Sequence, residues 1–269
     1  MRRAVQMIPY LHLGPLQIPT FGLMVALALI TSAYVLQADF DRRGMNADAF
    51  MMITVAGLAG IIGAKLMHLL DTPSDRVPLS LLFDRHWLFS QNGLSWIRLG
   101  FAWFGGFLGG FGAMLVMGWR AKLHMWEFLD ASSPAASFGY AIGRIGCFLS
   151  GDGDYGKPTS LPWGMSFPNG IVPTTERVHP APLYEFAVWC LIGWFLWRLG
   201  SKVLGKSRPA GEIFCLYLLL TGVARFLVEI IRINPPWVWG MSSAQVASLA
   251  SILVGGILFL FLLRERKSA

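Results

Sequence analysis

Long apolar stretches alternate with short polar segments along almost the whole chain. Six stretches have the length that a helix needs to cross a bilayer, about 20 mostly apolar residues. They cover roughly 20–38, 49–70, 101–119, 181–199, 211–232 and 243–263. A seventh, 130–149, is rich in small residues and contains Pro134, so we expect a helix packed inside a bundle, away from lipid. The pattern predicts an all-α, polytopic membrane protein with seven transmembrane helices.

The composition agrees with this pattern. Hydrophobic residues make up 55% of the chain and charged residues only 14%, which is outside the usual range of soluble domains. The three cysteines, Cys147, Cys190 and Cys215, lie in or beside apolar segments and form no CxxC pair, so neither a disulfide framework nor a metal site is expected. We expect a single integral membrane domain over residues 1–269, with a short elaboration on the outer face at about 150–180.

The distribution of basic residues predicts an orientation. Lys and Arg are more frequent in one set of loops, which includes 42–43, 120–122, 198–208 and the C-terminal tail, than in the opposite set. Because positive charge is retained on the cytoplasmic side, this bias predicts a periplasmic N-terminus and a cytoplasmic C-terminus. The net charge of +7 requires no nucleic acid partner, since basic residues beside spans also meet anionic lipid head groups.

Glycines recur at helical spacing in two of the predicted spans. They are three residues apart in AGLAGIIGAK (56–65), and in FGGFLGGFG (104–112) Gly105 and Gly106 each have a glycine four residues later. Both spacings place a stripe without Cβ atoms on one helix face, which lets two helices approach closely in lipid. The alternative is that Gly105 and Gly106 leave space for a lipid head group.

Three charged residues share one face of the predicted span at 211–232. Arg225, Glu229 and Arg232 are four and then three residues apart. One interpretation is an ion pair between Arg225 and Glu229 with a purely structural role. On this face, however, one carboxylate cannot neutralise two guanidiniums. The remaining positive charge favours an anionic ligand, and phosphate fits guanidinium geometry in a bidentate manner.

Arg144 is another arginine within a predicted span, and an arginine at the bilayer centre costs about 2.5–3.5 kcal/mol on insertion scales. It lies in AIGRIGCFLSGDGDYG, where Asp152 and Asp154 follow it. One of these carboxylates, or Glu185, is a candidate ion-pair partner. The alternative is a phosphate held between Arg144 and Arg225, which would face inward from separate helices.

The motif HPAPLYE at 179–185 is typical of the entry into a helix, because proline suits the first turn. Glu185 is expected in the first turn of that helix, where the helix dipole favours a glutamate, so a helix cap is one interpretation of this residue. His179 is a candidate for proton transfer, although a single histidine in a loop more often has no such role.

Six segments, in this order, resemble the prolipoprotein diacylglyceryl transferases of bacterial inner membranes. They are FGLM (21–24), GLAGIIGAKL (57–66), FGGFLGG (104–110), GRIGCFLSGD (143–152), HPAPLYE (179–185) and ARFLVEIIR (224–232). The resemblance covers about residues 16–263, and its most specific parts are GRIG, HPxxLYE and RFxxExxR.

The resemblance implies an enzyme of the bacterial inner membrane with seven spans. Such an enzyme takes the diacylglyceryl group of phosphatidylglycerol, attaches it to the lipobox cysteine of a preprolipoprotein as a thioether, and releases glycerol 1-phosphate. The partners implied are phosphatidylglycerol, the lipobox segment and membrane lipid, without nucleic acid. No metal or other cofactor is implied.

The resemblance also assigns roles to single residues. Arg144 and Arg225 match the family's two essential arginines and are expected to be catalytic and to hold the lipid phosphate. Asp152 falls where the family usually has a glutamate and is the third expected catalytic residue. The other residues expected to bind substrate are Glu229, Gly105, Gly106, Gly156 and Tyr184.

Three positions depart from the family pattern. Phe21 replaces a tyrosine, Phe104 replaces a histidine proposed as the general base, and Cys147 replaces an asparagine. These changes thin a polar network, because the groups present hydrogen-bond weakly or not at all. Cys147 is interpreted as a buried structural residue, with covalent catalysis as the alternative.

The identity of a general base is therefore open at this stage. An electropositive pocket favours the thiolate of the incoming cysteine, so the arginines alone can suffice. If a base is needed, Asp152 and Asp154 are the nearest candidates along the chain, followed by His179.

Two other functions fit the sequence. One is a phospholipid-binding relative that is inactive or uses another acceptor, and the other is a transporter of a small anion. Transport predicts charge spread along a path and helices broken at mid-depth. Here the arginines and acids gather toward the outer ends of the predicted spans, so the transferase is the prediction.

Overall fold

The chain is mostly helical. The structure is a computed structural model, and it describes residues 7–14, 16–88, 90, 92–93, 102–203 and 209–268. Its long helices are α1 (Thr20–Arg43), α2 (Ala49–Asp71), α6 (Trp103–Arg120), α7 (Met125–Ser150), α8 (Ala181–Val203), α9 (Glu212–Ile231) and α10 (Ser243–Ser268). Each of the predicted segments is therefore confirmed as a helix. By length and hydropathy α1, α2, α9 and α10 are able to cross a membrane.

The boundary of α7 differs from the prediction. This helix begins at Met125, ahead of the expected residue 130, so Pro134 lies well inside it. A proline within a helix removes one backbone hydrogen bond. The hydroxyls of Ser133 and Ser137 donate to the carbonyls of Leu129 and Ser133 in the same region of the helix, at 2.8 Å and 3.1 Å.

Two short hairpins were not predicted and qualify the all-α description. Strands β1 (Tyr10–Leu13) and β2 (Leu16–Pro19) form one antiparallel pair, and β3 (Met165–Phe167) and β4 (Thr174–Val178) form the other. Short helical pieces, η1 (Pro73–Asp75), α3 (Leu79–Leu82) and α4 (Arg85–Leu88), follow α2. The expected outer elaboration at 150–180 thus contains the β3–β4 hairpin.

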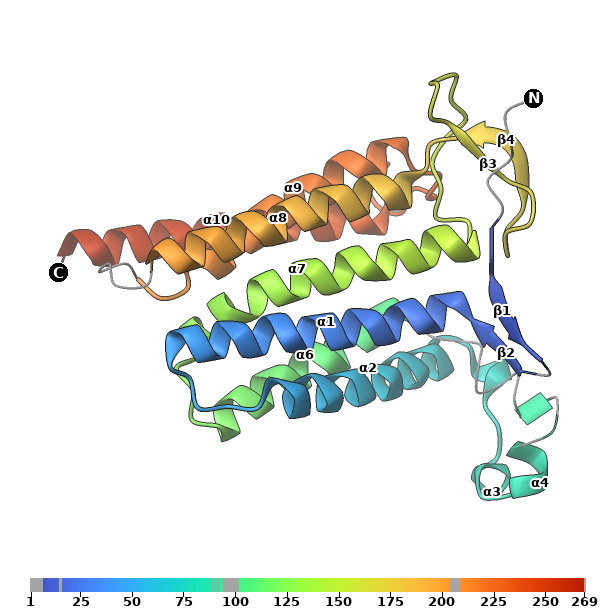
Figure 1. Cartoon of the computed structure of the whole chain (residues 1–269), viewed down its shortest axis with the longest axis horizontal. Coiled ribbons are helices and arrows are strands. Elements are labelled where there is room, and N and C mark those ends of the chain that lie inside the picture. Colours follow the sequence, from blue (N-terminus) through green and yellow to red (C-terminus); the bar gives the residue numbers. More distant parts are fainter. Residues whose placement is uncertain are drawn as a thin grey trace. The chain divides into compact units, whose positions relative to one another are not determined.

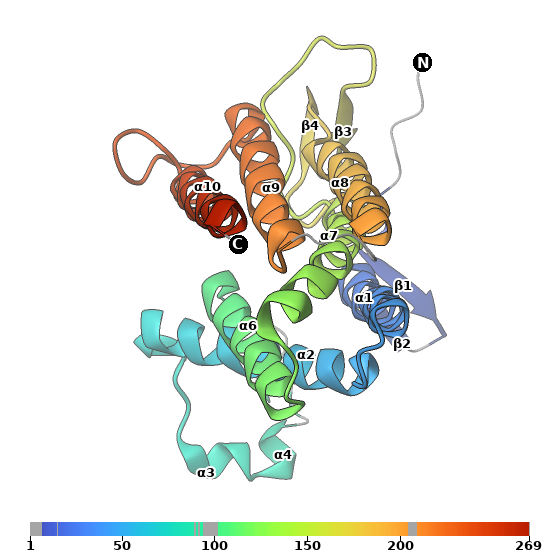
Figure 2. The ribbon, with the colours of Figure 1, turned by 90° about the vertical axis from the view of Figure 1, so that its left-hand side faces the viewer.

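The chain divides into two compact units. Unit 1 comprises Met1–Ala47 and His124–Ala269, and unit 2 comprises Asp48–Leu123. In unit 1, α7 packs against α1, α8 and α9, and α9 also packs against α10. Figure 1 shows these helices side by side, and Figure 2 looks along them.

Both hairpins lie at one end of unit 1, where α7 ends (Figure 1). The backbone N–H of Ile8, just before β1, donates to the carbonyl of Leu149 at 3.1 Å, and that of Ile171, between β3 and β4, donates to Ser150 at 3.0 Å. The hydroxyl of Thr20 bonds to the carbonyl of Pro9 at 3.0 Å and so fixes the start of α1. The hairpins are therefore attached to the end of α7 through backbone groups.

A charged cluster joins the helices of unit 1 at the opposite end. The buried Asp39 accepts from Arg42 Nε at 2.6 Å and from Arg43 Nε at 2.7 Å. Arg42 also donates to the carbonyl of Trp197 on α8 at 3.0 Å. Asp130 of α7 accepts from the N–H groups at the start of α9, which a helix leaves without partners of its own. These contacts link α1 to α8 and α7 to α9.

In unit 2, α2 and α6 touch along their glycine stripes. A Cβ atom added to Gly105 would overlap the carbonyl of Gly63 and the Cβ of Met67, and one added to Gly63 would overlap the carbonyl of Gly105. The N–H of Ala102 donates to the carbonyl of Ala64 at 3.0 Å, across the same contact. Small residues at such a seam allow backbones to pack directly.

Replacing Gly63 by leucine is expected to separate α2 from α6, because the new side chain has no space at the seam. Overpacking of this kind costs about 1–3 kcal/mol or more. The apparent melting temperature of the purified protein, followed by tryptophan fluorescence in detergent, is expected to fall by several degrees.

Gly112→Ala serves as the control, since a Cβ at Gly112 in α6 meets no atom within 4 Å among the described residues. An unchanged melting temperature in Gly63→Leu would contradict direct packing at this seam.

Candidate functional site

The site is built around Arg144, in the C-terminal part of α7. Gly146 lies two residues on, and a Cβ there would stand 3.0 Å from the Cβ of Met24 in α1 and 3.2 Å from the ring of Phe21. The helix ends at Gly151, whose φ of 59° is the left-handed conformation that glycine adopts without strain. This turn brings the next acidic residues back toward Arg144.

Arg144 is buried and makes three contacts. Its Nη1 lies 2.5 Å from Asp154 and donates to Cys147 Sγ at 3.3 Å, and its Nη2 lies 2.5 Å from Glu185. Two of the three carboxylates proposed as its partners from the sequence therefore pair with it. A buried guanidinium without partners would be costly, and these carboxylates offset that cost.

Glu185 is the centre of the site. Its side chain is fully buried, and its Oε1 accepts from Tyr140 at 2.8 Å and from Arg225. Its Oε2 lies 2.5 Å from Arg144 and 3.4 Å from Arg232. The motif does start α8, as predicted, but Glu185 lies beyond the first turn of the helix. The interpretation of Glu185 as a residue of that turn was wrong, because the carboxylate faces three arginines instead.

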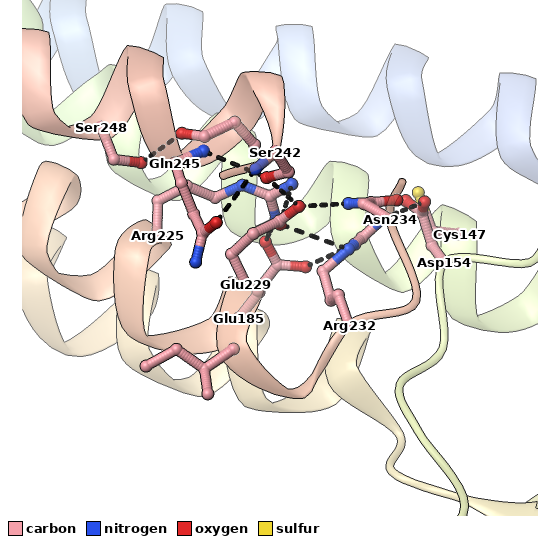
Figure 3. A network of polar contacts seen from close by, with 12 residues as sticks. Cys147, Asp154, Glu185, Arg225, Glu229, Arg232, Asn234, Ser242, Gln245 and Ser248 are labelled. Atoms are coloured by element: carbon pink, nitrogen blue, oxygen red, sulfur yellow. Dashed lines mark hydrogen bonds and ion pairs between the residues drawn. The ribbon is translucent and has the colours of Figure 1, made fainter. Parts of the chain in front are cut away.

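Glu229 forms the second part of the network. Its Oε2 lies 3.0 Å from Arg225 Nη2, so the predicted ion pair along α9 is confirmed. Its Oε1 accepts from the hydroxyl of Ser242 at 2.7 Å and from the side-chain amide of Asn234 at 2.5 Å. Figure 3 shows Ser242 and Asn234 bonded to this carboxylate.

Arg232 is the third arginine and follows α9 directly. It pairs with Asp154 through Nη2 and with Glu185 through Nη1, and its Nε lies 3.7 Å from Glu229. Only 6% of its side chain is exposed. Arg232 thus contacts carboxylates from the loop after α7, from α8 and from α9 (Figure 3).

The network balances its charges. Three arginines meet three carboxylates in it: Arg144, Arg225 and Arg232, with Asp154, Glu185 and Glu229. The surplus positive charge inferred along α9 is therefore cancelled by two carboxylates from other segments. A count of the charges along one helix leaves out the ion-pair partners that the fold brings from other segments.

Asp152 lies beside this network and next to Cys147. Burial and the negative charge of Asp154 raise the pKa of the Asp152 carboxyl above its ordinary value, while a hydrogen bond with Cys147 opposes the rise. Burial alone would also raise the pKa of Asp154, but Arg144 and Arg232 hold it well below its usual range. The two neighbouring carboxyls consequently differ in basicity.

Cys147, Asp152 and Asp154 place three ligand atoms within 4.8 Å of one another. Such a set can in principle hold a metal ion. Here Asp154 is already paired with two guanidiniums, which would repel a cation. The structure thus gives this group a role in the arginine network, and the absence of a metal stays a prediction.

Gly156 joins the segment that carries the β3–β4 hairpin to the end of α9. Its N–H donates to the carbonyl of His179 at 2.8 Å, and it forms a backbone bridge with Arg232. The next N–H, of Lys157, donates to the carbonyl of Ile231 at 2.7 Å. A Cβ at Gly156 would overlap that carbonyl, so glycine is required for the close approach.

Tyr184 lies in a separate polar group. Its hydroxyl accepts from Trp163 Nε1 at 2.8 Å and lies 3.3 Å from His179 Nδ1. No contact with the three arginines is recorded for it among the described residues. Its expected role in binding substrate stays a prediction.

The glycines expected to bind lipid lie in unit 2. Gly105 is buried against α2, as the packing interpretation predicted, and a Cβ at Gly106 would lie 3.4 Å from the Cβ of Ala64. Phe104, at the position of the family's histidine, is about half exposed. A contact of Gly105 and Gly106 with a head group stays a prediction.

The central role of Glu185 and the bond from Tyr140 were not predicted, whereas Arg232 was expected only as a charge on the same helix face as Arg225 and Glu229. Tyr140 lies one helical turn before Arg144, and this spacing is the signal that was present in the sequence. For Glu185 the signal was an acidic residue in a motif that also carries His179. Neither pattern alone shows which groups meet in space.

Comparison with known proteins identifies the family. A model of the family described as prolipoprotein diacylglyceryl transferase matches residues 9–261. The chain is similar to two proteins named phosphatidylglycerol--prolipoprotein diacylglyceryl transferase. That of Clostridium tetani is 30% identical over 247 residues, 91% of this chain and 93% of that protein. That of Mannheimia succiniciproducens is 31% identical over 274 residues, 96% of this chain and 92% of that protein. The chain therefore belongs to the prolipoprotein diacylglyceryl transferase family.

Proposed function

We propose that this protein is a multi-pass membrane transferase that moves the diacylglyceryl group of phosphatidylglycerol onto the lipobox cysteine of a prolipoprotein. Membership of the family supports this activity. The observation that carries it is the pair Arg144 and Arg225, which extend from different helices to the same carboxylate. Guanidiniums arranged in this way suit a phosphate group.

We also propose that all seven long helices cross the bacterial inner membrane, with a periplasmic N-terminus and a cytoplasmic C-terminus. The lengths of α6, α7 and α8, which are 18, 26 and 23 residues, are compatible with spanning or nearly spanning a bilayer. The bias of Lys and Arg toward the loops at 42–43, 120–122 and 198–208 supports the orientation. In this arrangement the single integral domain carries its arginine network near the outer face.

The proposed reaction needs a nucleophile and a stabilised leaving group. The lipobox thiolate attacks the glyceryl carbon that bears the phosphate, so that a C–S bond forms and the C–O bond to phosphate breaks. Glycerol 1-phosphate leaves with an additional negative charge. Arg144 and Arg225 stabilise that charge as it develops, which lowers the energy of the transition state.

Asp152 is proposed to accept the proton of the lipobox thiol. It lies directly after α7, next to Cys147, and its raised pKa makes it a better base than an ordinary aspartate. Cys147 occupies the space between Asp152 and Arg144 as a buried side chain. This assignment provides a base despite Phe104 at the position of the family's histidine.

The remaining residues complete the proposed binding site. Glu229 orients Arg225, and Gly156 holds the outer segment against Arg232. Tyr184, with Gly105 and Gly106, is proposed to contact the lipid or the peptide.

Purified protein, phosphatidylglycerol and a synthetic lipobox peptide provide the direct test. A mass gain of one diacylglyceryl group on the peptide cysteine, with release of glycerol phosphate, is the expected result. Binding of the lipid without any mass gain would instead indicate a relative that uses another acceptor, consistent with the loss of polar groups at Phe21 and Phe104.

Arg144→Ala and Arg225→Ala are each expected to lower kcat/KM by about 100-fold or more, because each removes a charge that stabilises the leaving group. Arg→Lys at either position is expected to recover only part of the activity, since an ammonium lacks the bidentate fork. Peptide mass is the readout, and size-exclusion chromatography checks that each variant is intact.

Cys147→Ser is the matched contrast. A serine hydroxyl can still accept a hydrogen bond from Arg144, so this variant is expected to keep much of its activity. Full activity in either arginine→Ala variant would contradict phosphate binding, whereas an intact but inactive Cys147→Ser variant would indicate covalent catalysis.

Asp152→Asn is expected to lower kcat by about 100-fold, a typical contribution of general base catalysis. In the unaltered protein, activity is expected to fall as the pH drops through the pKa of Asp152, because only the deprotonated carboxylate accepts a proton. Since that pKa is raised, the fall begins at a higher pH than for an ordinary aspartate. The pH profile of kcat checks this, and an identical profile in Asp152→Asn would exclude Asp152 as the base.

A further inference from the structure

The three carboxylates of the arginine network differ in their access to solvent. The side chain of Asp154 is 29% exposed, whereas those of Glu185 and Glu229 are 0% and 1% exposed. Glu185 and Glu229 also belong to the long helices α8 and α9, while Asp154 belongs to the turn that follows α7. Asp154 is therefore the anion of the network that an incoming ligand can replace with the least disturbance.

The charge balance also points to an exchange. The network holds three guanidiniums and three carboxylates, so adding a phosphodiester with its single negative charge would leave an excess anion in a largely buried site. An excess buried charge is costly. If Asp154 leaves the network as the phosphodiester enters, the net charge of the network stays constant.

We propose that Asp154 occupies the phosphate position while no lipid is bound, and that the phosphodiester of the lipid substrate replaces it on Arg144 and Arg232. The inference rests on the proposed function and adds two residues to it. Arg232 becomes a ligand of the phosphate, and Asp154 becomes an internal competitor that the lipid must displace.

Unused donors on the same arginines support the exchange. The Nε atoms of Arg144 and Arg232 are buried and donate no hydrogen bond to any of the residues that the structure describes. A buried donor without an acceptor is unfavourable. The carboxylate of Asp154 has two oxygens, whereas a phosphodiester adds two ester oxygens to its two terminal ones, so the phosphate can satisfy donors that Asp154 leaves unused.

The turn that carries Asp154 is held at both ends. Gly151 donates to the carbonyl of Cys147 at 3.0 Å, and Gly156 donates to that of His179 at 2.8 Å. Between them, the N–H of Asp154 bonds to the side chain of Asp152 at 3.2 Å and not to a backbone carbonyl. The side chain of Asp154 can thus turn away while the anchors at Gly151 and Gly156 remain.

Affinity for phosphatidylglycerol, measured with the full-length protein in detergent micelles, tests the exchange. Asp154→Asn keeps the shape of the side chain but removes its charge, so the Kd of the lipid is expected to fall by about 5- to 10-fold. Asp154→Ala is expected to act in the same direction, and Asp154→Glu, which retains the competing charge, is not expected to tighten binding. A gain in affinity is a result that a merely damaged protein does not give.

Glu176→Gln is the matched control. Glu176 is an exposed acid of β4 in the same outer segment, and its replacement changes the net charge equally without touching the arginine network. Tighter binding in Glu176→Gln to the same degree would show a general charge effect and overturn the exchange. Free glycerol 1-phosphate and uncharged diacylglycerol, titrated in parallel, separate recognition of the phosphate from recognition of the acyl chains. The phosphate compound is expected to share the gain in Asp154→Asn, and the diacylglycerol is not.

Hydrogen exchange of the unaltered protein provides a second measurement that needs no variant. Saturating phosphatidylglycerol is expected to increase deuterium uptake within residues 152–155, and uptake that stays equal or decreases would overturn the exchange. If the unaltered protein does not bind the lipid, or if Arg144→Ala binds it equally well, the proposed function itself fails. Binding that depends on Arg144 but does not change in Asp154→Asn or Asp154→Ala rejects this inference alone.

Discussion

The ion pairs of the Glu185 carboxylate are the interaction on which the hairpin end of unit 1 depends. It meets guanidiniums from α7, from α9 and from the residue directly after α9, and its side chain has no exposed surface. Removing one partner of a buried ion pair costs about 3–5 kcal/mol, since the other charge is left uncompensated. The relative positions of α7, α8 and α9 at this end therefore depend on the ion pairs of a single carboxylate. An enzyme that handles a charged head group next to lipid needs such fixed charges in place before its substrate arrives.

The two ends of unit 1 use buried charge for different purposes. At the end opposite the hairpins, Asp39 is enclosed by Arg42 and Arg43, and Asp130 completes the hydrogen bonds at the start of α9. Each of these contacts satisfies groups that the fold itself leaves open. Buried donors without hydrogen-bond partners occur at both ends, at Arg43 Nη2 and at the Nε atoms of Arg144 and Arg232, but only around Arg144 is one of the paired carboxylates partly exposed among the described residues. The exposure of Asp154 is what distinguishes the cluster around Arg144 from the cluster around Asp39, whose side chain is fully buried.

The helices could be predicted from the sequence because a spanning helix needs a long apolar stretch, and this property is local. The importance of Arg144 and Arg225 could also be predicted from the sequence, because a charge within an apolar segment is costly and is retained only where another group compensates it. The central position of Glu185 could not be predicted. Its partners come from α7 and α9, whereas a spacing rule relates residues of one helix only. The hairpins were missed because strands of three to five residues show too little alternation.

The short connection from Gly156 to Lys157 has a mechanical consequence. Through backbone hydrogen bonds it is joined on one side to His179, directly after β4, and on the other to Ile231 at the end of α9. A force applied to the β3–β4 hairpin is thus transmitted through a few stiff bonds to the residue next to Ile231, which is Arg232. Because this connection is bonded to the residue directly before Arg232, a displacement of the hairpin would also displace the backbone that carries the Arg232 guanidinium.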